Sequence, residues 1–495
     1  MVLVTTAGPN LSPRLVETHT AVLFFLADRV YKLKKPVDLA FLDFRSPAAR
    51  QRACAEEVRL NRRLTPDVYL GVADVTGPDG ALCDHLVVMR RLPAERRLAT
   101  LIASGAPVDE PLRQVARKIA AFHARGPAVE DPGRFGGPAA VARLWQDTFA
   151  RLQPHASRLG LLDVLDRCRR LSSRYLRGRG PLFADRVARG HVVDGHGDLL
   201  ADDIFCLDDG PRILDCLDFD ERLRIGDVLL DVAFLAMDLE RLGAPAAATI
   251  LLRDYREYAA ETHPPSLEDF YIAYRALVRT LVCGIRAEQG HPDATAEARV
   301  LAELCRTHLE RARTRLVLVG GLPGTGKSTV ATALADRDGW ALGSSDIVRK
   351  QLHGISPTTP APAGWEQGLY TPDATARTYH ALLDRAHSAL PRGESVVLDA
   401  TWRDSRWRTA ARELADATTT DLIELCCTAD PTTATARLRD RGRAGPHPSD
   451  ATVDVQTRMT DAADAWPTAT LIDTTRPPPH VLIAARAAAG VTPHN

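Results

Sequence analysis

One segment of the chain, residues 321–329, constrains the fold more than any other feature of the sequence. It reads Gly-Leu-Pro-Gly-Thr-Gly-Lys-Ser-Thr and fits the pattern G-x-x-x-x-G-K-[ST]. The apolar run Leu316–Val319 precedes it and the helical pattern Thr329–Leu334 follows it. In this context glycines let successive backbone N–H groups face phosphate oxygens, so the segment predicts a strand, a phosphate-binding loop and a helix. A glycine-rich turn that binds nothing is the alternative, and the strand–loop–helix context argues against it.

Two side chains of this loop predict direct contacts with a nucleotide. We expect Lys327 to reach the β- and γ-phosphates of ATP and the hydroxyl of Ser328 to bind Mg²⁺. Lys327 is one of six lysines among the 63 basic residues, so a compact ammonium group at this position is notable. The other residues of the predicted nucleotide site in the loop are Gly321, Gly324, Gly326 and Thr329.

The sequence pattern predicts three parts of the chain, two that precede the phosphate loop and one that contains it. Residues 1–93 read as strands and one helix, and residues 94–312 are mostly helical with a strand–loop–strand insert at Val192–Phe219. Residues 313–495 alternate strands and helices, which predicts an α/β fold with a parallel sheet. The predicted strands of that sheet are Leu316–Val319, Leu342–Gly343, Ser395–Leu398, Leu422–Cys426 and Thr470–Ile472.

Composition excludes several classes of protein. Lys plus Arg and Asp plus Glu are both 63, and the aromatic fraction is 5%, so neither a basic field nor stacking rings favour nucleic acid. The nine cysteines include no CxxC pair, so we expect reduced thiols in a cytoplasmic protein. The longest apolar run, Ala21–Ala27, is far shorter than the about 20 residues that span a bilayer, and no signal peptide is visible.

Polar residues at strand ends indicate which kind of nucleotide enzyme the last part resembles. Asp346 and Asp399 each end a predicted strand, and four arginines lie within residues 437–443. This pattern resembles small P-loop kinases that phosphorylate a hydroxyl, the group that includes gluconate kinase, polynucleotide kinase and zeta toxins. The resemblance implies that Asp346 accepts the hydroxyl proton, that Arg349 holds the substrate, and that residues 437–443, with Arg441 at the nucleotide, form a lid. Asp399 is either a metal partner or a buried strand-end acid, and the arginine run is alternatively a solvated helix face.

The insert at Val192–Phe219 contains a second pattern that fits phosphoryl transfer. Asp198 lies in the run His-Gly-Asp, Asp203 follows five residues later, and Asp215 follows a strand. Such acids can accept a hydroxyl proton and hold Mg²⁺ on ATP phosphates. The pattern resembles the aminoglycoside phosphotransferase/choline kinase family over roughly residues 15–310, a relative of protein kinases with a bilobal α+β fold.

That resemblance implies a role for each residue of the pattern. Asp198 matches the catalytic aspartate, Asp215 matches a metal ligand, and Asp203 stands where the family has an asparagine ligand. Asp218 is an alternative metal ligand. Leu200 replaces a second histidine that often follows the catalytic aspartate, Asp227 matches a structural aspartate, and His196 is expected to brace the loop.

Upstream, the strand Val30–Lys34 carries the predicted lysine for the α- and β-phosphates. By the same resemblance this is Lys32, with Glu57 on the following helix as its ion-pair partner. Lys34 shares the face of Lys32 at period two and Glu56 adjoins Glu57, so each assignment has a neighbouring alternative. A solvated strand end is the non-functional interpretation of this lysine cluster. No glycine-rich cover loop is present at Ala27-Asp28, which favours small-molecule acceptors over proteins.

The whole chain resembles bacterial fusions of an aminoglycoside-phosphotransferase-like domain with a P-loop kinase-like domain. The expected activity is ATP- and Mg²⁺-dependent phosphorylation of a hydroxyl on a small molecule, such as a sugar, an amino sugar or an aminoglycoside-like alcohol. One alternative is a nucleotide-sensing regulatory protein whose N-terminal domain binds ATP without efficient transfer. A polynucleotide kinase is a further alternative, against which the zero net charge argues. No membrane partner is expected.

Overall fold

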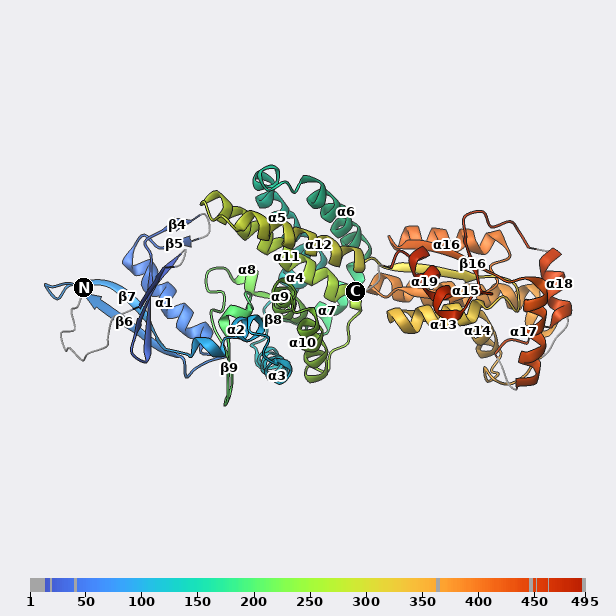
Figure 1. Ribbon diagram of the computed structural model, residues 1–495, viewed down its shortest axis with the longest axis horizontal. Coiled ribbons are helices and arrows are strands. Elements are labelled where there is room, and N and C mark those ends of the chain that lie inside the picture. The colour runs from blue at the N-terminus through green and yellow to red at the C-terminus, as the bar shows by residue number, and fades with distance from the viewer. Residues whose placement is uncertain are drawn as a thin grey trace. The chain divides into compact units, whose positions relative to one another are not determined.

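The computed structural model describes residues 14–17, 20–39, 42–361, 366–444, 448–450, 452–461 and 463–491. The chain divides into two compact units, which Figure 1 shows with their elements labelled. The first contains residues 1–165, 183–263 and 271–306, and the second contains residues 166–182, 264–270 and 307–495. The last change of unit follows Arg306, close to the boundary that the sequence predicts near residue 312.

An antiparallel sheet with the strand order β1-β2-β3-β7-β6 begins the first unit. Helix α1 packs against β6 and β7 (Figure 1), and Ser46 caps it by accepting a hydrogen bond from the Ala49 N–H. A short ladder of β4 and β5 precedes α1. The bounds are β1 (Arg14–Glu17), β2 (Ala21–Leu26), β3 (Arg29–Lys34), β4 (Asp38–Leu39), β5 (Leu42–Asp43), α1 (Pro47–Asn61), β6 (Tyr69–Thr76) and β7 (Leu82–Arg90).

Helices dominate the chain after β7, as predicted. The bounds are η1 (Ala94–Arg96), α2 (Leu98–Ala103), α3 (Asp109–Arg125), α4 (Gly133–Gly136), α5 (Pro138–Leu159), α6 (Leu162–Gly178), α7 (Gly180–Ala188), α8 (Glu221–Arg224), α9 (Val228–Arg241), α10 (Pro245–Tyr258), α11 (Pro265–Glu288) and α12 (Ala294–Arg311). The sequence predicts α3, α5, α6, α9, α11 and α12 and does not predict α2, α4, α7, α8 and α10. Helix α9 is buried on every side over residues 228–239, so its acidic side chains lie inside the unit.

Two short antiparallel ladders interrupt these helices and carry the His-Gly-Asp segment. Strand β8 pairs with β11, and β9 pairs with β10. Their bounds are β8 (Val192–Asp194), η2 (Ala201–Asp203), β9 (Ile204–Leu207), β10 (Gly210–Ile213) and β11 (Ile225–Asp227). Asp198 and Asp203 lie between β8 and β9, which belong to different ladders, and Asp215 directly follows β10.

The second unit contains a parallel five-stranded sheet of order β13-β14-β12-β15-β16, which confirms the predicted α/β fold. The strands are β12 (Arg315–Gly320), β13 (Ala341–Ser344), β14 (Val396–Asp399), β15 (Asp421–Thr428) and β16 (Thr470–Asp473). The central strand β12 is buried along its whole length, which explains its continuous apolar sequence.

Helices cover both faces of this sheet (Figure 1). Side chains of α13 and α19 pack on one face, and those of α14, α15 and α16 pack on the other. The bounds are α13 (Lys327–Asp338), α14 (Ser345–Leu352), η3 (Gly368–Tyr370), α15 (Pro372–Ala389), η4 (Leu390–Arg392), α16 (Ser405–Ala417), α17 (Pro431–Ala444), α18 (Val453–Asp461) and α19 (Pro478–Ala488). Within the described parts of the chain, no helix has the length and apolar character to cross a membrane.

Candidate active sites

The predicted phosphate loop connects β12 to the N-terminus of α13. Its three glycines have φ values of 135°, 84° and 82° at Gly321, Gly324 and Gly326, in the region that side chains rarely adopt. A Cβ atom on Gly321 would lie 2.6 Å from the Cys427 carbonyl oxygen, and one on Gly324 would lie 2.5 Å from the Ala434 carbonyl oxygen. The loop therefore needs glycine for both conformation and space, and its amides lie at a helix N-terminus that favours anions.

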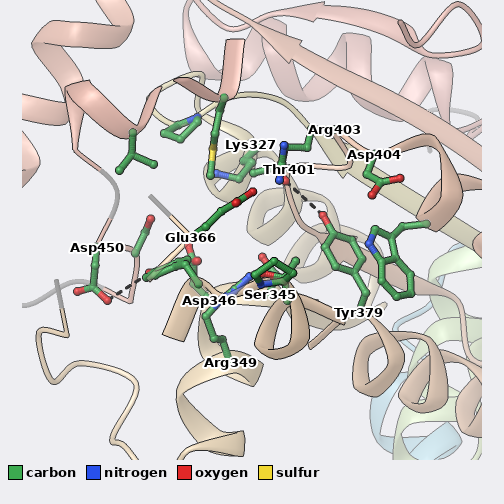
Figure 2. Close-up of a pocket in the computed structure, with 18 of the residues that line it drawn as sticks. Lys327, Ser345, Asp346, Arg349, Glu366, Tyr379, Thr401, Arg403, Asp404 and Asp450 are labelled. Carbon is green, nitrogen blue, oxygen red and sulfur yellow. Dashed lines mark hydrogen bonds between the residues drawn. The ribbon is translucent and has the colours of Figure 1, made fainter. Parts of the chain in front are cut away.

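A cavity of about 300 Å³ lies beside this loop (Figure 2). Lys327, Asp346 and Arg349 all line it, so the structure brings these three predicted site residues together. Figure 2 shows Lys327 and Asp346 on opposite sides of the open space. Asp346 lies in the first turn of α14, directly after β13, and has no hydrogen bond or ion pair among the described residues. A free carboxylate thus faces the same space as the lysine of the phosphate loop.

Arg349 is buried in the wall of this cavity and has no acidic partner among the residues that the structure describes. Its side chain is 7% exposed, and its guanidinium lies 4.7 Å from the centre of the Tyr370 ring. Within the described part of the chain, its Nε and Nη1 atoms have no hydrogen-bond partner. A buried guanidinium with two unused donors is available for an oxygen-rich ligand, because leaving those donors unpaired costs about 1–3 kcal/mol each.

The phosphate loop also has residues that fit a divalent cation. Asp399 ends β14 and is 4% exposed, and the Ser328 hydroxyl hydrogen-bonds to its carboxylate. Its Oδ1 atom is buried and has no partner. Burial raises the pKa of Asp399, an effect that the Lys327 charge opposes. Hydroxyl and carboxylate oxygens are the ligands that Mg²⁺ takes, so this donor pair fits the ion.

Among the residues that the structure describes, no group of three or more His, Cys, Asp or Glu side chains is arranged to hold a metal ion. Mg²⁺ is usually held by one or two carboxylates together with phosphate oxygens and water, so its binding does not require such a group. Thr329 follows Ser328 and is exposed on the first turn of α13.

The predicted arginine lid begins as a packed helix. Ala434 and Leu438 of α17 are buried, and both contact the position of a Cβ on Gly324. Arg437 donates hydrogen bonds from Nη1 to Thr474 Oγ1 at 3.0 Å and from Nη2 to the Thr474 carbonyl at 2.7 Å. The Thr474 hydroxyl in turn donates to the Thr325 carbonyl at 2.7 Å. Arg437 is therefore tied to the phosphate loop, whereas the side chain of Arg441 lies outside the described residues.

In the first unit, buried hydrogen bonds hold the loop that carries Asp198. The Asp231 carboxylate accepts hydrogen bonds from the N–H groups of His196 and Gly197, both at 2.7 Å, and pairs with His123 Nε2 at 3.0 Å. His196 braces the loop, as expected, through Nε2 and the Leu214 carbonyl at 3.0 Å.

Asp231 was missed by the sequence analysis, which assigned the structural aspartate to Asp227. Asp227 pairs with Arg186 at 2.6 Å and caps α9 through the Leu229 N–H at 2.9 Å, so it is structural but does not hold the loop. The two acids lie one helical turn apart at the start of α9. Because sequence spacing alone does not say which of two such acids faces the loop, the packing of α9 decides it.

The predicted pair of Lys32 and Glu57 is present, and Lys34 joins it. Lys32 Nζ lies 2.8 Å from Glu57 Oε1 and 2.8 Å from Asp215 Oδ1. Lys34 Nζ lies 2.8 Å from Glu57 Oε2 and 2.9 Å from Asp218 Oδ2. Burial by itself would lower the pKa of Lys32, but the nearby carboxylates raise it well above its usual value. The alternative partner Glu56 is excluded, because its exposed carboxylate pairs with Arg59.

Three carboxylates influence one another around Asp198. Burial raises the pKa of Asp198 to about 6, and two arginines of α11 oppose that rise. Burial also raises the pKa of Asp203 well above its usual value, and the charges of Asp215 and Asp198 act in the same direction. Lys32 is the main cause that lowers the pKa of Asp215, which has a left-handed φ of 63°. A concentration of negative charge of this kind fits a bound cation.

Comparison with known proteins gives two family matches along the chain. Residues 26–270 match the phosphotransferase enzyme family, and residues 316–465 match an AAA domain family. The chain is a kinase-fold phosphotransferase domain followed by a P-loop domain. Uncharacterized proteins of Mycobacterium tuberculosis and Mycobacterium bovis are 41% identical over 464 residues, which cover 93% of this chain and 92% of each relative. The chain belongs to the family of these mycobacterial proteins.

Three solved structures have lower sequence identity to this chain. A choline/ethanolamine kinase family protein from Mesorhizobium loti is 16% identical, covers 62% of this chain and 90% of its own, and has a TM-score of 0.38. The GDP and kanamycin complex of an aminoglycoside phosphotransferase is 16% identical, covers 61% and 95%, and also has a TM-score of 0.38. A gluconokinase from Sinorhizobium meliloti 1021 is 19% identical, covers 35% and 90%, and has a TM-score of 0.27.

Proposed function

We propose that this protein is an ATP- and Mg²⁺-dependent phosphotransferase with two kinase sites, each of which phosphorylates a hydroxyl of a small molecule. The observation that carries the proposal is the cavity beside the phosphate loop, which Lys327, Asp346 and Arg349 line together. A phosphate-binding lysine, a free carboxylate and a buried unpaired arginine are the groups that transfer to a hydroxyl requires.

In the C-terminal site, the chemistry follows from the charges of these groups. The ammonium of Lys327 attracts the β- and γ-phosphates. The Asp346 carboxylate accepts the proton of the acceptor hydroxyl while the hydroxyl oxygen bonds to the γ-phosphorus. The bond from that phosphorus to the bridging oxygen breaks, and ADP leaves. Arg349 orients the acceptor. Mg²⁺ held by Ser328 and Asp399 would neutralise phosphate charge.

The N-terminal site has a corresponding set of groups. Lys32, held by Glu57, would bind the α- and β-phosphates, and Asp198 would accept the hydroxyl proton. A pKa of about 6 suits this role, because the carboxylate is ionised near neutral pH and is still a better base than an ordinary aspartate. Asp203 and Asp215 would hold Mg²⁺ in this domain, with Asp218 as the alternative ligand.

A nucleotide-sensing role for the N-terminal domain is the second candidate, and one observation favours it. Both acids that could bind metal after β10 are engaged by lysines, Asp215 by Lys32 and Asp218 by Lys34. A site in which these pairs persist would bind nucleotide with little transfer. ATP binding there would then change the turnover of the C-terminal site, which is a coupling between two sites.

Transfer of ³²P from ATP into a metabolite extract tests the proposal with the full chain. We expect labelled product from the wild type, with loss of C-terminal product in Lys327→Ala and Asp346→Asn and loss of N-terminal product in Asp198→Asn. Asp336→Asn, at an exposed position on α13, is the matched control and should behave as the wild type. Binding of ATP without labelled product in any extract would overturn the kinase proposal and favour the sensor.

A further inference from the structure

Helix α11 carries two arginines, Arg275 and Arg279, that have no acidic partner among the described residues. Arg275 is 5% exposed; its Nε donates to the Leu230 carbonyl at 3.0 Å, and its guanidinium lies 4.5 Å from the centre of the Phe234 ring. Arg279, one helical turn further, has a buried Nε without a hydrogen-bond partner. Arg275 is thus buried and Arg279 partly buried, and neither forms an ion pair with an acid of the described residues.

Other buried arginines of the same unit are arranged differently. Arg186 pairs with Asp227 and Glu261, and Arg224 pairs with Asp194 at 2.5 Å. Pairing is the usual arrangement because an uncompensated buried charge is unfavourable. Arg275 and Arg279 have no such ion pair among the described residues, and the Asp198 carboxylate acts on both only through its charge. Their remaining guanidinium donors are therefore available to an anionic ligand.

The position of these arginines relative to the reacting groups identifies the ligand. Arg275 bonds the carbonyl of Leu230, the residue before Asp231, and Asp231 holds the loop that carries Asp198. The charges of Arg279 and Arg275 both act on the Asp198 carboxylate, opposing the effect of burial on its pKa. The two guanidinium groups therefore lie near the place where the acceptor hydroxyl would bind.

Apart from Asp198 and Asp203, the carboxylates around the same loop are already engaged in hydrogen bonds or ion pairs. Asp231 is bonded to two backbone amides and His123, and Asp238 is bonded to the Ala201 N–H and to Arg241. Asp215 and Asp218 are paired with lysines. A cationic acceptor would find these acids occupied and the two arginines of α11 nearby, which is unfavourable.

We propose that the N-terminal site takes an acceptor that carries an anionic group, a carboxylate or a phosphate, near the hydroxyl to be phosphorylated, and that Arg275 and Arg279 bind this group. The guanidinium fork matches the oxygens of both groups. The inference rests on the proposed kinase function of this domain. In the transfer step, the acceptor oxygen bonds to the γ-phosphorus, its proton passes to Asp198, and the bond to the bridging oxygen breaks to release ADP. The arginines only bind and select.

The first test measures the arginines without knowledge of the acceptor. In the full chain carrying Lys327→Ala, phenylglyoxal modification of Arg275 and Arg279 is followed by mass spectrometry, with and without the ATP analogue AMP-PNP and Mg²⁺. Phosphate or citrate at millimolar concentration should slow modification at both residues about tenfold or more, whereas choline and spermidine should not. Arg59, which is exposed and paired with Glu56, is the control and should react equally in all conditions.

The second test measures selectivity in the same chain with glucose, glucosamine, glucuronate and glucose 6-phosphate as acceptors. We expect kcat/KM to be highest for an anionic acceptor. Arg279→Met should lower that value about 10²-fold while the affinity for AMP-PNP stays unchanged. Arg275→Lys retains the positive charge at the buried position and should lower kcat/KM less than Arg279→Met does. This comparison separates a binding role from a folding defect. The comparison of glucuronate with glucose 6-phosphate distinguishes carboxylate from phosphate.

Each outcome decides one of the two proposals. Protection by choline or spermidine, or no protection by anions while AMP-PNP binds, would overturn the anionic acceptor and leave the kinase proposal intact. Protection by anions without any binding of AMP-PNP would support the anion site and overturn the kinase function of this domain. Preference for glucosamine over both anionic sugars would also refute the inference.

Discussion

Replacing Asp231 by Asn should loosen the loop that carries Asp198. The carboxylate accepts two backbone hydrogen bonds at 2.7 Å, one at each oxygen, and pairs with His123 at 3.0 Å. An amide has only one accepting oxygen, so one loop N–H would face an NH₂ group and lose its partner. Hydrogen bonds to charged groups contribute about 1.5–3 kcal/mol each, so we expect a loss of about 2–4 kcal/mol in the free energy of unfolding of this unit.

The catalytic consequence follows from the displacement of Asp198. A shift of about 1 Å in a reacting group can lower a rate about 10²-fold, so transfer by the N-terminal site should fall by about that factor. Hydrogen exchange of the His196 and Gly197 amides, read by mass spectrometry, measures the loosening directly, and urea unfolding measures the stability. Asp208→Asn, at a side chain that is 95% exposed, is the control and should change neither. Unchanged exchange and unfolding in Asp231→Asn would refute the assigned role.

Four further predictions concern single groups. Lys327→Ala should abolish most turnover at the C-terminal site without unfolding it, as measured by ATP turnover and circular dichroism, because no other lysine lies in the loop. Gly324→Ala should abolish ATP binding there in calorimetry, because its Cβ would lie 2.5 Å from the Ala434 carbonyl oxygen at a φ of 84°. The third prediction uses the Lys327→Ala chain, in which kcat/KM of the N-terminal site should be constant above a pH of about 6. Below that pH it should fall about tenfold per pH unit, because protonated Asp198 cannot accept a proton. A profile that stays level down to pH 5 would contradict this prediction. Arg179→Met should lower the unfolding free energy of the second unit by about 2–4 kcal/mol, because it removes several buried hydrogen bonds. Arg179 donates them to the carbonyls of Leu390, Thr418 and Thr419. The control is Arg170→Met at an exposed position, which should change the unfolding free energy by less than about 0.5 kcal/mol.

Much of the fold could be predicted because its signals are local. The alternation of apolar strands and helices after residue 312 is sufficient for a parallel sheet, since the pattern of each element depends on its own burial. The cap at Ser46 and the left-handed φ of 50° at Ala27 likewise depend on neighbouring residues in the chain. Helix α10 was missed although it has the 3.6-residue period, and α7 is only nine residues long, which leaves little period to detect.

The residues of the candidate sites also differ in whether neighbouring residues in the chain are enough to predict them. The glycines and lysine of the phosphate loop lie within a few residues of one another, so their spacing alone predicts where their backbone and charges lie. The choice between Lys32 and Lys34 could not be made, because a strand with a period of two places both on one face and Glu57 accepts both. The exclusion of Glu56 came only with the packing of α1 on the sheet.

By itself, the sequence determined that this chain has a phosphate loop between a buried strand and a helix, and an aspartate-bearing loop of the kinase type. Both are short segments whose conformation depends on their own residues. Only the tertiary structure showed that Asp231 rather than Asp227 holds the loop of Asp198, and that Arg275 and Arg279 form no ion pair with a described acid. These relations join residues that are far apart in the chain. The packing of helices α9 and α11 determines them, and this packing cannot be predicted from residue spacing.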